Sequence, residues 1–211
     1  MNSEDKIHQE LDTEAKILLA AEKEFMLKGF AGARTTSIAE AAGVTHAMFH
    51  YYFRTKEKLF DRIITEKIEL LKDALMKPVA DMDLTLDEMI RNIIEGHLDF
   101  IAANPDLPRF IIGELSGNSE RFALFLDKIS TYAQIMISRM QEKIDSAVAE
   151  GLCCHIDART LMMDIASLNI FPYLAAPIVN AALDNYMADA DTFLEQRKKD
   201  NYATIMRKLK P

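Results

Sequence analysis

Apolar residues recur along most of the chain three or four positions apart, with polar residues between them, which is the spacing of amphipathic helices. This spacing predicts long helices over residues 56–76, 84–103, 120–150 and 191–209, a helix capped by Asp157, and a short apolar segment over 108–115. Pro78, Asn104-Pro105 and Gly151 are the expected helix ends. Alternating strand patterns are few, so the sequence predicts an all-α fold.

The segment 38–56 has a pattern of its own, two short helices joined by a tight turn. Ile38 and Ala42 have helical spacing, and Gly43 falls where a helix ends in a positive φ, a conformation that costs glycine least. Thr45 is the expected N-cap of the second helix, because its hydroxyl can accept from free backbone N–H groups.

The second helix of this segment is predicted to have two unlike faces. Phe49 and Phe53 lie one turn apart on an apolar side, and the opposite side carries His46, Ala47, His50 and Tyr51. A helix that faces only a core does not need this second, hydrogen-bonding face. The pattern is therefore typical of a helix-turn-helix that presents one helix to a DNA groove.

Lys56 and Lys58 lie in the first turn of the next predicted helix, where the helix dipole disfavours cations. A DNA phosphate over that helix start would reverse the penalty, and Thr35 or Thr36 is placed to contact a second phosphate. The alternative interpretation is that both lysines are ordinary solvated charges.

These residues resemble the N-terminal domain of the TetR family of bacterial transcriptional repressors. The resemblance rests on five motifs that together fall within about a quarter of the chain: Gly29-Phe30, Ile38-Ala39, Ala42-Gly43-Val44, His50-Tyr51-Tyr52-Phe53, and Lys56 with Leu59-Phe60. It implies an N-terminal three-helix helix-turn-helix domain, a C-terminal helical domain for ligand binding and dimerisation, and repression that a small molecule relieves.

The resemblance also implies which side chains contact DNA. The implied phosphate contacts are Thr35, Thr45, Tyr51 and Lys56, and the implied base readers are His46, Ala47 and His50. Ala47 stands where many members have glycine, and His50 stands where many have a tyrosine that contacts phosphate. His50 can hydrogen-bond a phosphate or a base edge, and both interpretations stay open from the sequence.

Charge is divided unevenly over the 211 residues. The whole chain carries a formal net charge of −8, yet residues 28–58 hold five bases against two acids, which leaves +3 there and −11 elsewhere. Because residues 28–58 are basic and the rest of the chain is acidic, we do not expect DNA to wrap around the whole protein. We predict a DNA-binding domain over residues 1–58 and a helical ligand-binding and dimerisation domain over 59–211.

Methionine and aromatic side chains gather in the middle helices. Such side chains adapt to irregular apolar ligands, so they are candidates for a pocket, although plain core is the alternative. His97 and Glu114 are polar groups on apolar helix faces that could orient a ligand. The candidate pocket residues are Met89, His97, Phe100, Phe110, Glu114, Met136 and Met140.

Residues 165–182 are almost wholly apolar, apart from Asn169 and Asn180, and we expect Pro172 and Pro177 to kink or break the helix. A helix that is apolar all round needs cover on more than one side, and a partner subunit is the simplest second cover. Core contacts within one subunit are the alternative. The candidate dimer residues are Leu168, Phe171, Leu174 and Ile178.

Several classes of protein are disfavoured. The sequence has no phosphate-binding glycine loop, zinc-protease motif or nucleophile elbow, so we do not expect an enzyme or a cofactor. Cys153 and Cys154 are adjacent and followed by one histidine, too few ligands for structural zinc, so we interpret them as reduced thiols and expect no metal. No apolar run is long enough to span a bilayer, and we expect a cytoplasmic protein.

The sequence as a whole predicts a homodimeric repressor that binds double-stranded operator DNA and is released by an apolar or amphipathic small-molecule effector. The alternative is an activator, or a regulator controlled by a partner without a small-molecule inducer.

Overall fold

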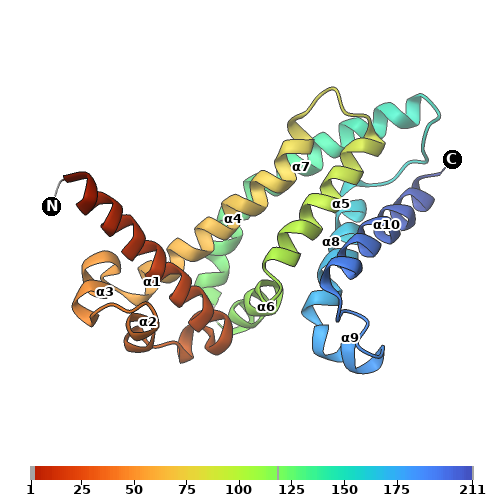
Figure 1. Cartoon of the computed structure of the whole chain (residues 1–211). Coiled ribbons are helices and arrows are strands. Elements are labelled where there is room, and N and C mark those ends of the chain that lie inside the picture. Colours follow the sequence, from red (N-terminus) through yellow and green to blue (C-terminus); the bar gives the residue numbers. More distant parts are fainter. Residues whose placement is uncertain (1–2, 118, 211) are drawn as a thin grey trace. The chain divides into compact units, whose positions relative to one another are not determined.

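The computed structural model describes residues 3–117 and 119–210, which form ten helices (Figure 1). The all-α prediction is confirmed. The helices are α1 (Ser3–Gly32), α2 (Thr35–Ala41), α3 (His46–Phe53), α4 (Lys56–Ala80), α5 (Leu86–Ala103), α6 (Leu107–Gly117), α7 (Ser119–Ala149), α8 (Ala158–Leu174), α9 (Ala176–Ala182) and α10 (Ala190–Leu209).

The chain divides into two compact units, Met1–Ile68 and Glu69–Pro211. The division falls inside α4, whereas the sequence prediction placed the domain boundary between residues 58 and 59. The physical reason is that the first turns of α4 belong to the N-terminal core, where Leu59, Phe60 and Ile63 are buried. The N-terminal unit therefore keeps these turns.

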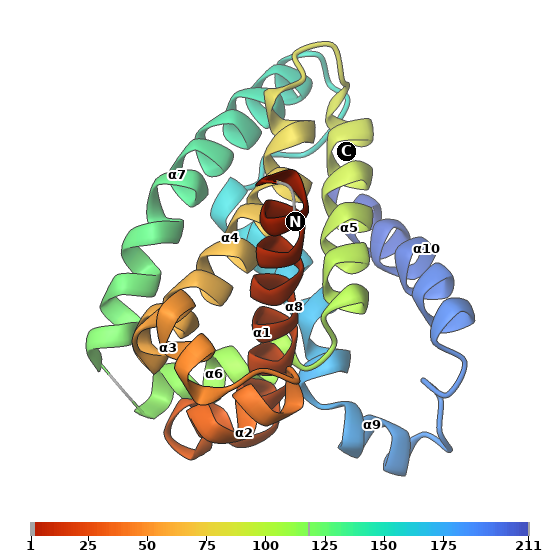
Figure 2. The same ribbon diagram turned by 60° about the vertical axis from the view of Figure 1, so that its left-hand side comes forward.

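The core of the N-terminal unit is built on aromatic rings. Phe25 and Phe30 of α1 are stacked with ring centroids 5.9 Å apart, and Phe60 of α4 meets both rings edge-on at 5.3 and 5.1 Å. Edge-to-face and offset pairs of this kind add about 0.5–1.5 kcal/mol each to the burial of the rings. They fix the start of α4 against α1, and α2 packs on α1 beside them (Figure 2).

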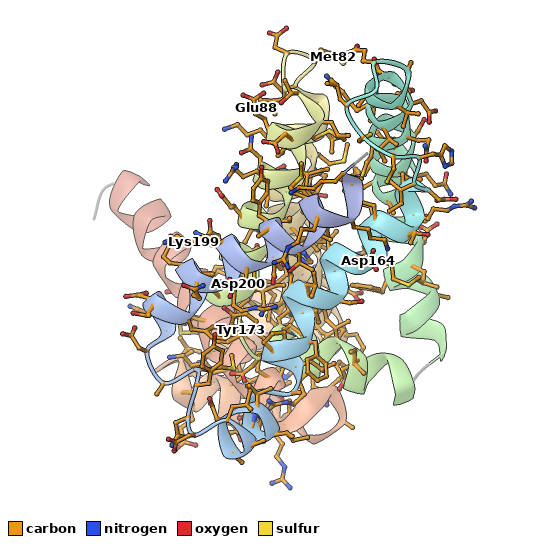
Figure 3. The ribbon with its side chains drawn as sticks, turned by 90° about the vertical axis from the view of Figure 1, so that its right-hand side faces the viewer. Met82, Glu88, Asp164, Tyr173, Lys199 and Asp200 are labelled. Atoms are coloured by element: carbon orange, nitrogen blue, oxygen red, sulfur yellow. The ribbon has the colours of Figure 1, made fainter. Side chains whose placement is uncertain are left out.

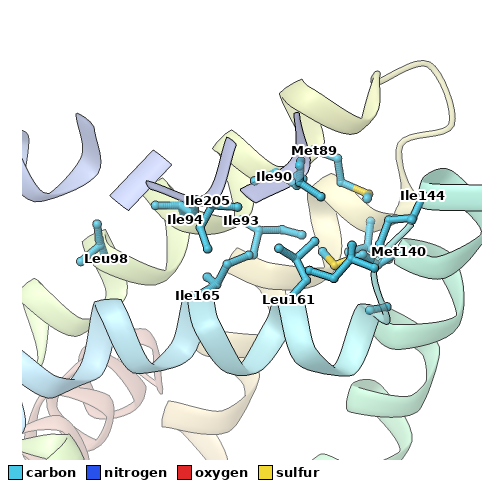
Figure 4. Packing of buried hydrophobic residues seen from close by; sticks show 14 of the residues in the cluster. Met89, Ile90, Ile93, Ile94, Leu98, Met140, Ile144, Leu161, Ile165 and Ile205 are labelled. Carbon is cyan, nitrogen blue, oxygen red and sulfur yellow. The ribbon is translucent and has the colours of Figure 1, made fainter. Parts of the chain in front are cut away.

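The core of the C-terminal unit lies among α5, α7, α8 and α10 (Figure 4). α5 contributes a fully buried stripe at helical spacing, Met89, Ile90, Ile93, Ile94 and Leu98. Met140 and Ile144 of α7, Leu161 and Ile165 of α8, and Ile205 of α10 meet this stripe. Thr85 and Glu88 form a capping box that begins α5.

The sequence predicted that α4 stops before Pro78, and that prediction was wrong. In the structure α4 continues through Pro78 to Ala80. Proline has no N–H to donate to the carbonyl of Ala74 one turn earlier, which is the usual reason for a stop. Here Pro78 and Val79 are buried, and their contacts hold the last turn in place. Gly96 of α5 lies against the same carbonyl, since a Cβ at position 96 would be 3.1 Å from the Ala74 oxygen.

The apolar run over residues 165–182 breaks as expected. α8 ends at Leu174, Ala175 lies between the helices, and α9 leaves at an angle of 75°. Pro172 is tolerated inside α8, and Pro177 lies in the first turn of α9. Within the part of the chain that the structure describes, no single helix is long and apolar enough to cross a membrane.

Candidate DNA-binding surface

The turn between α2 and α3 is a complete helix-terminating motif. The Gly43 N–H donates to the Glu40 carbonyl (3.0 Å) and the Val44 N–H to the Ala39 carbonyl (2.9 Å), so the last carbonyls of α2 are satisfied. Gly43 has φ of 68°, and a Cβ there would meet no atom within 4 Å. The backbone conformation, not crowding, is therefore what requires glycine.

α3 begins and is oriented as the sequence predicted. The Met48 N–H donates to the Thr45 hydroxyl at 3.2 Å, which confirms Thr45 as the N-cap. Phe49 and Phe53 are buried, and α3 packs on α2. The opposite side of α3 faces solvent with His46, Ala47, His50 and Tyr51, of which Tyr51 is 74% exposed.

The two histidines of this exposed side are held in place by neighbours. Their ring centroids lie 4.3 Å apart, with the rings nearly perpendicular. His46 Nε2 lies 3.1 Å from the Thr35 hydroxyl, which joins the starts of α2 and α3. His50 Nδ1 lies 2.8 Å from the carbonyl oxygen of Arg54 at the end of α3. The two rings are thus positioned before any DNA arrives.

Lys56 has partners that the sequence did not reveal. Its ammonium donates to the carbonyls of Phe30 (2.8 Å) and Ala33 (3.0 Å) and lies 4.4 Å from the centre of the Phe30 ring. These carbonyls end α1, where a cation is favourable. Lys56 therefore fixes α4 to the end of α1 with two of its three N–H groups. Its contact with phosphate stays a prediction.

The remaining candidate phosphate contacts lie at two places on this unit. Thr35 is half-buried beside His46, and Thr36 is exposed on the first turn of α2. Arg54 and Lys58 are exposed near the end of α3 and the start of α4, so the basic segment does present cations to solvent. The Lys58 N–H donates to the Thr55 hydroxyl (3.2 Å), which caps α4.

Two regions of the chain match known families. Residues 17–63 match the family described as bacterial regulatory proteins, tetR family. Residues 87–204, more than half of the chain, match the family described as Tetracyclin repressor-like, C-terminal domain. The chain belongs to the TetR family. It is a helix-turn-helix DNA-binding transcriptional regulator and not an enzyme, as the sequence predicted.

Individual TetR-family relatives agree with this assignment. An uncharacterized HTH-type transcriptional regulator, YdgC of Bacillus subtilis, is 24% identical over 177 residues, which is 81% of this chain and 90% of the relative. The HTH-type transcriptional repressor SCO4008 of Streptomyces coelicolor is 34% identical over 102 residues, 48% of this chain and 49% of the relative. The crystal structure of the TetR family regulator PfmR from Thermus thermophilus shares the fold, with a TM-score of 0.68 at 19% identity over 92% of this chain and 99% of PfmR.

The candidate ligand residues of this TetR-family chain are spread over three helices. Met89 and Met140 are fully buried, and Phe100 and Met136 pack against the same core. Phe110 and Glu114 lie on α6, Phe110 buried and Glu114 half-buried. A cavity of about 420 Å³ lies between the start of α5, the end of α7 and the end of α10, and the seven candidates are not among the residues that line it.

His97 belongs to a buried polar cluster that the sequence did not predict. Asn169 Nδ2 lies 3.2 Å from the Ile94 carbonyl and 3.3 Å from His97 Nδ1, and Asn201 donates to Asn169 Oδ1 at 2.7 Å. Burial lowers the pKa of His97 to about 4, so the ring is neutral near pH 7. The available signals were Asn169, a polar interruption of the apolar run, and His97, a polar group on an apolar helix face.

The candidate dimer residues differ in exposure. Phe171 is 61% exposed and Ile178 is 72% exposed, whereas Leu168 and Leu174 are half-buried. Leu168 and Phe171 line a groove of about 430 Å³ between α8, α9 and α10, together with Phe193 and Arg197. Figure 3 looks onto α8 and α10, which lie side by side there, with Asp164 and Tyr173 on the former and Lys199 and Asp200 on the latter.

Within the described part of the chain, no cluster of three or more His, Cys, Asp or Glu side chains is placed to hold a metal ion.

Proposed function

We propose that the protein is a homodimeric repressor that binds a near-palindromic operator with its two α3 helices and releases it when an apolar or amphipathic small molecule binds the C-terminal unit. We place this action in the cytoplasm. The observation that carries the proposal is the exposed side of α3, which offers His46, Ala47, His50 and Tyr51 from a helix anchored by Phe49.

Dimerisation is supported by the apolar side chains that α8 and α9 leave in water. Met163 and Phe171 on α8 are 69% and 61% exposed, and Ile178 on α9 is 72% exposed. Large apolar side chains that cluster on one surface mark an interaction site. A second copy of the chain would cover them through a surface that is the same on both subunits.

The dimer can be tested with one charge. Phe171→Glu places a carboxylate in the proposed interface at a side chain that is 61% exposed, so the variant should fold and sediment as a monomer at micromolar concentration. Thr131→Glu adds the same charge to an exposed position of α7 and should stay dimeric. A wild-type protein that sediments as a monomer would remove the dimer from the proposal.

A dimer sets the geometry of the DNA site. Two recognition helices related by a two-fold axis predict half-sites about one helical turn apart, roughly 34–36 Å, or somewhat more. In vitro selection followed by footprinting measures this spacing directly. A single asymmetric protected segment shorter than one turn would count against two readers.

Release by a small molecule is supported by the size and lining of a cavity in the C-terminal unit. The cavity of about 420 Å³ lies within the range of sites for small molecules, about 300–1,000 Å³. Its lining is amphipathic, with apolar side chains such as Leu84 and Met206 beside charged ones such as Lys143. A hundredfold loss of operator affinity needs about 2.7 kcal/mol of coupling, and operator DNA must then weaken ligand binding by the same factor.

A thermal-shift screen of metabolites and drugs, with each hit retested for operator release, tests the switch. Hits that raise the melting temperature and release the operator support the induced repressor. Hits that stabilise the protein and leave operator affinity unchanged would favour the alternative function, an activator or a partner-controlled regulator.

A further inference from the structure

The hydrogen bond between His50 and Arg54 fixes which nitrogen of the His50 ring carries the proton. His50 Nδ1 lies 2.8 Å from the Arg54 carbonyl oxygen, and a carbonyl oxygen can only accept. Nδ1 must therefore be the donor. In the neutral ring the other nitrogen, Nε2, then has no hydrogen and presents a lone pair.

The bond from His50 to the Arg54 carbonyl is part of the hydrogen bonding that ends α3, so the His50 ring does not turn freely. The Arg54 N–H donates back to the His50 carbonyl at 3.1 Å, so two hydrogen bonds join these residues. Arg54 has φ of 56° and ψ of −51°, a conformation that L residues rarely adopt. The imidazole donor satisfies the carbonyl that this conformation exposes, which ties the orientation of the ring to the helix end.

His46 provides the contrast within the same exposed side. Its Nε2 lies 3.1 Å from the Thr35 hydroxyl, and a hydroxyl can both donate and accept. The structure therefore fixes the hydrogen-bonding character of His50 and not that of His46, although the two rings are 4.3 Å apart.

A nitrogen that can only accept has few partners on DNA. Phosphate oxygens are also acceptors, so the neutral His50 ring has nothing to donate to the backbone through Nε2. In the major groove the donors are the exocyclic amino groups, N4 of cytosine and N6 of adenine, while guanine and thymine offer acceptors to this edge. The choice between phosphate and base that the sequence left open is thereby narrowed.

We propose that His50 is a specificity-determining residue that accepts a hydrogen bond from the exocyclic amino group of a cytosine or an adenine in each operator half-site. This inference rests on the proposed operator binding and adds the chemical class of base that one residue reads. Replacing that base by guanine or thymine removes the donor and sets two acceptors against each other.

The test uses a pair of substitutions that separates the two ring nitrogens. His50→Asn keeps an N–H near the place of Nδ1, able to donate to the Arg54 carbonyl, and leaves nothing at the place of Nε2. His50→Gln reaches the place of Nε2 with an amide oxygen and gives up the bond to Arg54. Melting temperatures of both variants establish that each is folded.

The probes are the operator selected by the wild-type protein, random DNA, and operators in which one cytosine or adenine at a time lacks its exocyclic amino group. Binding is measured at about pH 8. For the wild type, one amino deletion in each half-site should weaken binding about tenfold, or about 1.4 kcal/mol. H50N should lose that sensitivity and keep its affinity for random DNA, whereas H50Q should retain the sensitivity.

The inference is overturned if no amino deletion affects the wild type, or if H50N stays sensitive to the same deletion. It is equally overturned if H50N loses operator and random-DNA binding by the same factor, since His50 would then be a phosphate contact. These outcomes leave operator binding itself intact. A wild-type protein that selects no operator from random DNA would instead remove the proposed function.

Discussion

Each unit of this protein holds a small cluster of polar side chains that includes histidine. The two clusters differ in whether their hydrogen-bonding groups face solvent or the core. On α3, His46 and His50 are exposed and keep ring edges open to solvent. In the C-terminal unit, His97, Asn169 and Asn201 are buried and bond mainly to one another. One cluster is available to a partner molecule, and the other is used up within the fold.

This difference shows why residue type alone does not identify a functional histidine. His97 was a ligand candidate because it is a polar group on an apolar helix face, and the structure shows its Nδ1 3.3 Å from Asn169 Nδ2 on a distant helix. His50 was a DNA candidate because of its face, and the structure leaves its outer edge exposed. What separates them is whether the fold supplies a partner for each polar atom.

The largest expected effect comes from breaking the buried cluster. Asn169→Leu leaves the Asn201 amide and His97 Nδ1 without their partner in the core. We expect the free energy of unfolding in urea to fall by about 2–4 kcal/mol, because each buried unsatisfied group costs about 1–3 kcal/mol. The operator affinity of the folded fraction should not change.

Thr160→Leu is the matched control, because it makes a similar change on the exposed side of the same helix. It should shift the free energy of unfolding by no more than about 0.5 kcal/mol. An Asn169→Leu variant as stable as this control would mean that the cluster contributes nothing to stability.

The pH dependence of stability distinguishes a buried histidine from an exposed one. Burial lowers the pKa of His97 to about 4, whereas in the unfolded chain it is near the ordinary value of about 6.5. The unfolded chain therefore binds more protons between these values. Stability from this group is fully present above about pH 6.5 and is lost as the pH falls toward 4, by about 2–3 kcal/mol in total.

His97→Gln replaces the imidazole, which titrates, by a neutral polar amide, which does not. Urea unfolding of both proteins at about pH 7 and about pH 4 isolates the histidine, since the carboxylates titrate in both. Equal losses of stability in the two proteins would show that His97 is not buried as a neutral ring.

Lys56 sharpens the comparison because it bonds within the fold and is also a predicted contact of a DNA phosphate. Lys56→Ala removes the donor from the Phe30 and Ala33 carbonyls, so we expect the free energy of unfolding to fall by about 1–2 kcal/mol. If its remaining N–H also reaches a phosphate, operator and random DNA should weaken by similar factors and the salt dependence should flatten by about one unit of slope. A stability loss with unchanged DNA binding would place Lys56 wholly inside the fold.

The smallest expected effect is at the cap of the reading helix. Thr45→Ala takes the acceptor from the Met48 N–H and should lower the free energy of unfolding by about 1 kcal/mol. Thr45→Ser keeps the hydroxyl and should restore most of it. If both variants lost the same stability, the methyl group of Thr45 would matter and the cap would not.

Features that depend on neighbours along the chain could be predicted from the sequence. Gly43 at positive φ, Thr45 as a cap, and the two faces of α3 all follow from residues within a few positions of one another. The end of α4 was predicted wrongly, because the stop signal of Pro78 is local, and the contacts of Pro78 and Val79 that override it are not.

Features that depend on distant partners could not be predicted. His97 and Asn169 are 72 residues apart, and the Lys56 ammonium bonds to carbonyls 23 and 26 residues earlier. No periodicity or motif encodes which side chains meet across helices. The sequence therefore singled out His97 and Asn169 but not Asn201, and only the three-dimensional fold shows that the three side chains meet.

The most direct test of the central claim, that the exposed side of α3 reads DNA sequence, is the ratio of operator to random-DNA affinity for wild type and for His46→Ala. His46 is exposed on α3, where its Nε2 lies 3.1 Å from the Thr35 hydroxyl. We predict that His46→Ala lowers operator affinity about tenfold while random-DNA affinity stays near that of the wild type, so the ratio falls. Equal losses on both DNAs would contradict base reading by this side of α3 and would make His46 a phosphate contact.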